Sequence, residues 1–167
     1  DALISTCPLK SVRLKSSQVT IELLQQGLDK LWIFGNYSAV NPQLIPVITQ
    51  NLKYFVLEYD YKFCSYRSIE KHVAETGQCN CHDSVQGKTV ADFYRNAKTV
   101  FWMSAKQLQK YVDRFPFLSQ NSVVLSSVFS KQTLNKIQQL TSEPKAERTK
   151  WIVLGSNSWV KGFDAAK

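Results

Sequence analysis

Short apolar runs, rich in β-branched and aromatic residues, alternate along the chain with longer amphipathic segments. The runs have the length of β-strands and lie at residues 31–34, 54–57, 99–103, 123–125 and 151–154, with a weaker one at 2–6. Each run is almost continuously apolar, which is typical of parallel strands that helices cover on both faces. The alternation predicts an α/β domain, a Rossmann-like three-layer sandwich with a mostly parallel sheet.

Capping residues mark the start of the amphipathic segments between these runs. The candidate helix caps are Ser17, Asn41, Ser68, Ser104 and Ser130. Two glycines, Gly27 and Gly77, can end the helices that begin at Ser17 and Ser68. The longest connection, at about residues 63–88, is expected as an irregular insertion that contains cysteine and histidine. We expect residues 1–167 to form a single Rossmann-like domain, the amino-terminal half of a larger enzyme.

Composition supports a folded domain and excludes several classes of protein. The 167 residues are 44% apolar, which suffices for a core, and no run approaches the ~20 apolar residues of a membrane helix. The chain has no Gly-x-Gly-x-x-Gly and no complete Gly-x-x-x-x-Gly-Lys-Ser/Thr loop, which argues against a dinucleotide enzyme and a nucleoside triphosphatase. A Gly-x-Ser-x-Gly elbow is also absent, which argues against an α/β-hydrolase.

The net charge of +8 comes entirely from the second half of the chain. Residues 88–167 hold thirteen basic and five acidic residues, whereas residues 1–87 hold eight of each. Lys106, Lys110 and Arg114 are spaced to form one stripe on a helix. This stripe is interpreted as a solvated helix face, as a surface for anionic lipid or, without any recognition motif, as a nucleic-acid contact.

Ligands of open parallel sheets bind beyond the carboxyl ends of the strands, and here those ends are polar. The candidate substrate-binding residues at these ends are Asn36, Tyr37, Lys62, Arg67, Ser126, Ser127, Ser156 and Asn157. Hydroxyl and amide groups at such positions suit sugar hydroxyls or phosphates, although serine and asparagine also serve as ordinary helix caps.

The densest polar cluster follows the run at residues 54–57. Glu58 and Asp60 are candidate catalytic residues for acid/base chemistry, and Lys62 with Arg67 could clamp a phosphate. In the alternative interpretation, the two carboxylates pair with these two cations and only satisfy a buried strand end.

Four cysteine and histidine side chains in the insertion leave three chemical states open. Cys64, His72, Cys79 and Cys81, with His82 beside them, could hold zinc, although Cys-x-Cys replaces the usual Cys-x-x-Cys. Cys64 could instead form a disulfide with Cys79 or Cys81, or all the thiols could stay reduced, as in an intracellular compartment. We assign no metal ligand from the sequence.

Several runs of residues, in chain order, resemble one enzyme family. The runs at 31–37, 58–62, 64–67, 71–72, 101–104, 124–129, 153–156 and 158–162 are similar to the amino-terminal half of group-1-type glycosyltransferases of the GT-B fold from bacteria or viruses. The resemblance implies an acceptor-side domain of an enzyme that transfers sugar from a nucleotide sugar to a glycan or lipid-linked acceptor.

The resemblance also implies which partners the domain has. The nucleotide-sugar donor would bind in a carboxyl-terminal domain, so this domain would bind no cofactor and would be inactive alone. The implied location is cytoplasmic, with peripheral contact to anionic lipid at the inner membrane surface. One alternative is a non-catalytic interaction module of the same fold, stabilised by zinc. The other is a basic nucleic-acid-binding domain, although the sequence contains no recognition motif for nucleic acid.

Overall fold

The computed structural model describes residues 4, 7–125 and 129–142, and its contacts divide the chain into two units. One unit comprises residues 12–127, and the other comprises residues 1–11 with 128–167. The first unit carries the sheet and the core. The predicted run at 151–154 lies outside the described residues, as does all of the run at 2–6 except Ile4.

Four parallel strands form the sheet, in the order in which they occur along the chain. They are β1 (Leu31–Phe34), β2 (Lys53–Glu58), β3 (Val100–Trp102) and β4 (Ser122–Val124). The register pairs Phe34 with Val56 and Glu58 with Trp102. These strands confirm four of the predicted runs, and the arrangement is an α/β fold consistent with a Rossmann-like domain.

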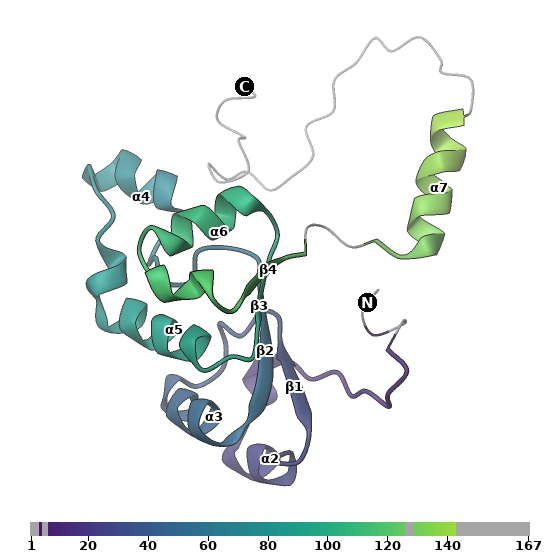
Figure 1. Ribbon diagram of the computed structural model, residues 1–167, viewed down its shortest axis with the longest axis horizontal. Coiled ribbons are helices and arrows are strands. Elements are labelled where there is room, and N and C mark those ends of the chain that lie inside the picture. The colour runs from purple at the N-terminus through teal and green to yellow at the C-terminus, as the bar shows by residue number, and fades with distance from the viewer. Residues whose placement is uncertain (1–3, 5–6, 126–128, 143–167) are drawn as a thin grey trace. The chain divides into compact units, whose positions relative to one another are not determined.

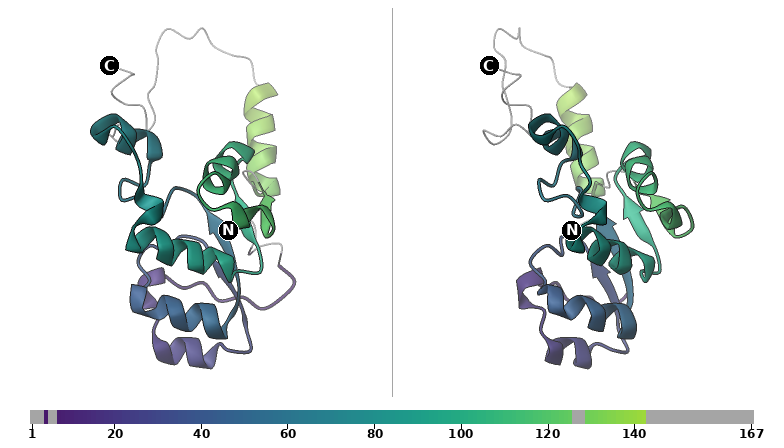
Figure 2. Two further views of the ribbon diagram at one scale, coloured as in Figure 1. Left: turned by 60° about the vertical axis from the view of Figure 1, so that its left-hand side comes forward. Right: turned by 90° about the vertical axis from the view of Figure 1, so that its left-hand side faces the viewer.

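The helices that connect the strands lie on one face of the sheet (Figure 1). Helices α2 (Ile21–Gln26), α3 (Ile45–Asn51) and α5 (Val85–Arg95) are stacked side by side, as the turned views in Figure 2 also show, and α6 (Ala105–Val112) follows β3. Sequential strand order with right-handed crossovers places successive helices on the same side.

The opposite face of the sheet differs from the prediction. In β1, Leu31 and Ile33 alternate with the half-buried Trp32 and the buried Phe34 and remain 56% and 58% exposed. Val123 of β4 is 46% exposed. The expectation that helices cover both faces is therefore not met in the unit of residues 12–127, where the described elements form two layers. An apolar strand shows that a face can be buried, but it does not show which segment buries it.

Most helix ends follow the predicted caps. Asn41 caps the 3-10 turn η2 (Pro42–Leu44) that leads into α3, and Ser104 caps α6. The start of α2 was predicted wrongly, because Thr20 and not Ser17 accepts the capping hydrogen bond, while Ser16–Gln18 form the separate 3-10 turn η1. Two further 3-10 turns, η3 (Cys81–Asp83) and η4 (Pro116–Ser119), precede α5 and β4.

The segment predicted as an irregular insertion is largely helical. It contains α4 (Ile69–Thr76), which Ser68 caps and Gly77 ends, and then η3 and the first turn of α5. Gly77 has a φ of 82°, a left-handed conformation that glycine adopts without steric cost. The capping residues at 68 and 77 thus shape this segment as the sequence indicated.

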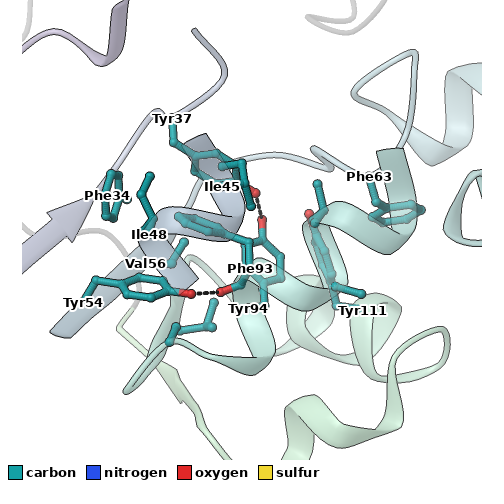
Figure 3. Packing of buried hydrophobic residues seen from close by; sticks show 14 of the residues in the cluster. Phe34, Tyr37, Ile45, Ile48, Tyr54, Val56, Phe63, Phe93, Tyr94 and Tyr111 are labelled. Atoms are coloured by element: carbon teal, nitrogen blue, oxygen red, sulfur yellow. Dashed lines mark hydrogen bonds between the residues drawn. The ribbon is translucent and has the colours of Figure 1, made fainter. Parts of the chain in front are cut away.

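Aromatic rings fill the space between the sheet and its helices (Figure 3). Phe93 of α5 packs with its ring centroid 5.0 Å from that of Tyr54 and 5.4 Å from that of Phe34. The Tyr54 hydroxyl donates a 2.6 Å hydrogen bond to the Phe93 carbonyl oxygen, so the phenol is buried with a partner. Trp102 and Tyr111, whose centroids lie 4.5 Å apart, extend the cluster to α6.

The second unit contains one described helix, α7 (Lys131–Ser142). Ser130 caps it as predicted, accepting a hydrogen bond of 3.1 Å from the Thr133 amide. Its apolar residues Leu134, Ile137 and Leu140 are about half exposed. Among the described helices of both units, none is long and apolar enough to cross a membrane.

Candidate functional site

Buried opposite charges meet where β2 ends. Glu58, the last residue of β2, has no exposed surface, and Lys62 is 4% exposed. One Glu58 carboxylate oxygen accepts hydrogen bonds of 2.8 Å from Lys62 Nζ and from the Asp60 amide. Because a buried charge is costly without a partner, this pairing explains how both groups are tolerated inside the fold.

A chain of hydroxyl groups connects Glu58 with the end of β1. Tyr94 of α5 donates a hydrogen bond to the second Glu58 oxygen, and Tyr37 donates one of 2.8 Å to the Tyr94 hydroxyl. Figure 3 shows the bond between Tyr37 and Tyr94. Tyr37 lies three residues beyond β1 and is 7% exposed, so the structure brings the predicted residues Tyr37 and Glu58 into one network.

Asp60 and Arg67 form the accessible part of this network. Asp60 Oδ2 lies 2.5 Å from an Arg67 guanidinium nitrogen, and Asp60 Oδ1 lies 3.2 Å from Lys62 Nζ. The side chains of Asp60 and Arg67 are 33% and 37% exposed, in contrast to those of Glu58 and Lys62. Solvent and solutes therefore reach the Asp60–Arg67 pair, while Glu58 and Lys62 lie beneath the surface.

The two carboxyl groups have opposite pKa shifts. Burial raises the pKa of Glu58 to about 7, against the opposing charge and hydrogen bond of Lys62. Burial also acts to raise the pKa of Asp60, but the Arg67 hydrogen bond and the charges of Lys62 and Arg67 outweigh it and hold that pKa below its usual range. Asp60 is therefore a carboxylate at neutral pH, whereas Glu58 gains or loses its proton near pH 7.

The backbone of this loop is held by α6. The Asp60 carbonyl oxygen accepts a hydrogen bond of 3.0 Å from the Tyr111 hydroxyl, and that hydroxyl accepts one of 3.1 Å from the Lys62 amide. Arg67 has a φ of 57°, an uncommon left-handed conformation for a residue other than glycine. Arg67 lies directly before Ser68, the cap of α4, and residues in such uncommon conformations cluster at functional sites.

The other predicted site residues are not shown to join this network. Asn36 is exposed, and its side-chain oxygen accepts a hydrogen bond of 2.8 Å from Ser38 Oγ. Ser126, Ser127, Ser156 and Asn157 lie outside the described residues. Tyr94 and Tyr111 were missed as network members because they occupy core positions of helices. In the sequence pattern, a tyrosine at such a position is counted as an apolar residue.

The cysteines and His72 of the predicted insertion also come together. The Nδ1 atom of His72 lies 3.5 Å from the Cys64 sulfur and 3.3 Å from the Cys81 sulfur, and the sulfurs of Cys64 and Cys79 are 3.7 Å apart. All four ligand atoms lie within 4.8 Å of one another. The disulfides considered from the sequence are not formed, since Cys64, Cys79 and Cys81 are free thiols and a disulfide requires about 2.05 Å.

The predicted basic stripe is partly neutralised. Lys110 forms an ion pair with Glu70 of α4, and Arg114 lies beyond the end of α6, where its guanidinium donates to the Lys110 carbonyl oxygen. Lys106 is the exposed member. A hollow of about 280 Å³, lined by Lys88, Arg95 and Arg114 among others, collects further positive charge near η3 and contains none of the predicted site residues.

Searches against protein-family models, curated proteins and solved structures found no match to this chain.

Proposed function

We propose that the chain is the acceptor-side domain of a glycosyltransferase that uses a nucleotide-sugar donor. The observation that carries the proposal is the convergence of polar groups from β1 and β2 at the carboxyl edge of a parallel sheet, where ligands of such sheets bind. The resemblance of the strand-end runs to the group-1 type supports the same function. The net charge of +8 favours an acceptor with phosphate or one held at an anionic lipid surface.

In this proposal, Asp60 and Arg67 contact the acceptor because they are the accessible members of the network. A carboxylate beside a guanidinium offers hydrogen-bond acceptors and donors for the vicinal hydroxyls of a sugar. Arg67 can also form a bidentate pair with a phosphate. Glu58 and Lys62 hold this pair in position from below. A catalytic role for Glu58 stays a prediction, since its proton would have to travel through the hydroxyls of Tyr94 and Tyr37.

The test is sugar transfer by the protein that contains this chain together with whatever follows it in the gene. Nucleotide release from a panel of UDP-, GDP-, ADP- and CMP-sugars should occur with one donor class in the presence of acceptor glycans. Asp60→Asn and Arg67→Gln should each lower kcat/KM by about 10²-fold, because they misplace or remove groups that orient the acceptor. Lys98→Gln, at an exposed lysine between α5 and β3, is the matched control and should keep full activity.

Two results would contradict the proposal. Folded protein that releases no nucleotide from any donor would favour the interaction module instead. Undiminished transfer by both variants would separate the reaction from the Asp60–Arg67 pair.

A further inference from the structure

We propose that Cys64, His72, Cys79 and Cys81 bind one zinc ion in a closed, structural site. The inference is independent of the glycosyltransferase proposal and rests on the geometry of these four side chains. From the sequence, zinc is one of the three states open to these side chains, and no metal ligand is assigned.

The distances between the ligand atoms match tetrahedral zinc. Zn–S bonds of about 2.3 Å and a Zn–N bond of about 2.05 Å place tetrahedral sulfurs about 3.8 Å apart and sulfur about 3.6 Å from nitrogen. The observed sulfur–sulfur separation is 3.7 Å, and the two sulfur–nitrogen separations are 3.5 and 3.3 Å. The remaining separations are all below 4.8 Å, so the four ligand atoms surround one common point at which an ion could bind.

The chemistry of the ligand set selects zinc over harder cations. Three thiolates and one imidazole form a Cys₃His set, which is standard for structural zinc, whereas calcium and magnesium require oxygen ligands. Buried cysteines can also pack as small apolar groups, but here a ring nitrogen of His72 faces two of the sulfurs. A nitrogen directed at thiols is the arrangement of a ligand set rather than of a hydrophobic contact.

Geometry also distinguishes between the two histidines. His82 follows Cys81 directly, and its ring lies against Phe115 with a centroid separation of 6.4 Å, while its Nε2 lies 3.5 Å from an Asp83 oxygen. His72 comes from the middle of α4, one helical turn after Ser68, and its ring stacks on Tyr66 at 4.6 Å. The packing of Tyr66 orients the His72 imidazole toward the sulfurs.

A neighbouring hydroxyl group supplies the sulfurs with a further hydrogen bond. The Ser65 hydroxyl lies 3.7 Å from the Cys81 sulfur. Such second-sphere contacts are a regular feature of metal sites and stabilise the negative charge that thiolates bring to the ion.

The site would join three successive segments of the chain. Cys64 belongs to the turn after β2, His72 to α4, and Cys79 and Cys81 to the link between α4 and α5. The same turn carries Lys62 and Arg67, so the metal would hold in place the loop that presents the Asp60–Arg67 pair. Four protein ligands leave no position for water or substrate, which makes the role structural.

The experiment is metal analysis of the full chain, expressed in zinc-supplemented medium and purified without chelator. We expect about one zinc per chain in the wild type, and a fall of at least about tenfold in Cys64→Ser, Cys79→Ser and His72→Gln. Two matched controls, Cys7→Ser and His82→Gln, change a cysteine and a histidine outside the set and should retain one zinc.

A second measurement covers the case that the ligand variants fail to fold. The wild-type chain, stripped with EDTA, is titrated with Co²⁺, and one equivalent should produce the visible absorption of a tetrahedral thiolate complex, which Zn²⁺ then abolishes. Folded wild type with under about 0.1 equivalents of metal and no cobalt spectrum would overturn the proposal. Iron in place of zinc, or equal metal loss in the control variants, would overturn it as well.

Discussion

Glu58 and Lys62 form a buried ion pair at the end of β2 that affects the stability of the fold. Both side chains are almost wholly buried, and each is the main partner of the other's charge. A buried ion pair of this kind contributes little net stability, yet removal of one partner leaves an uncompensated charge. Two predictions at the residue scale follow from this asymmetry.

The first prediction concerns the dependence of the free energy of unfolding on pH. Because burial raises the folded-state pKa of Glu58 from 4.5 to about 7, the folded protein keeps a proton that the unfolded chain releases between these values. This contribution to stability is complete below about pH 4.5 and is lost as the pH rises through 7. Between pH 5 and pH 8, the free energy of unfolding of the wild type should fall relative to Glu58→Gln by about 1–3 kcal/mol.

Urea unfolding at several pH values measures this difference, and the subtraction cancels titrations common to both proteins. Glu22→Gln is the control, because Glu22 is exposed and its pKa is lowered by a backbone hydrogen bond. A difference that stays flat over this pH range would contradict the prediction for Glu58.

The second concerns the pair itself. Above the pKa of Glu58, at about pH 8, Lys62→Met should lower the free energy of unfolding by about 3–5 kcal/mol, since it leaves the Glu58 carboxylate buried without its cation. The double variant Glu58→Gln/Lys62→Met should recover most of this loss, because it removes both charges. Chemical denaturation of the four proteins forms a double-mutant cycle, and purely additive effects would show that the two charges do not interact.

At the scale of elements, the link between α4 and α5 rests directly on a helix. Gly87 of α5 lies beneath η3, and a Cβ atom there would come within 2.2 Å of the Cys81 carbonyl oxygen and 2.6 Å of the His82 carbonyl oxygen. These contacts are with backbone, so they cannot be relieved by the rotation of a flexible side chain. The close approach requires glycine at this position.

Gly87→Ala should therefore destabilise the fold by about 1–3 kcal/mol, although alanine is the better helix former. The variant should also bind zinc more weakly, because it pushes Cys81 away from the other three ligands. Thermal unfolding and metal content are the measurements. Val85→Ala, in the first turn of the same helix at a side chain 83% exposed, is the control and should change stability by under about 0.5 kcal/mol.

Elements were predictable where a local signal defines them. The four described strands and the caps at Asn41, Ser68 and Ser104 follow from short apolar runs and from side chains that bond to their own helix. The start of α2 was not predictable, because Ser17 and Thr20 lie only three residues apart and either side chain can cap a helix. Likewise, spacing alone offered His72 and His82 as ligands, and only three-dimensional distances separate them.

At the scale of the whole molecule, the core that the structure describes lies within residues 12–127. The clustered buried residues run from Val19 to Leu118, and all of them lie within this unit. A chain of residues 12–127 should therefore unfold cooperatively, with a Tm within a few degrees of that of the full chain. Calorimetry tests this, and a loss of cooperative unfolding would show that residues 1–11 or 128–167 complete the core.

The layer structure was the part of the fold that the sequence predicted least well. Continuous apolar strands led us to expect cover on both faces, whereas Leu31 and Ile33 are exposed within this unit. The composition of a strand reports how apolar its two faces are, and the order of strands decides on which face the connecting helices fall. That order depends on long-range pairing, which no local pattern contains.

The most direct test of the proposed function locates the ligand on the chain. Backbone amide spectra of the ¹⁵N-labelled, zinc-loaded chain are recorded during titration with hexoses, N-acetylhexosamines and their phosphorylated forms. The account predicts that shift changes for a bound sugar centre on residues 59–67 and 36–38, and that Arg67→Gln abolishes them while Lys98→Gln does not. Changes centred instead on the hollow formed by Lys88, Arg95 and Arg114, or no change with any sugar, would contradict the placement of the acceptor at the end of β2.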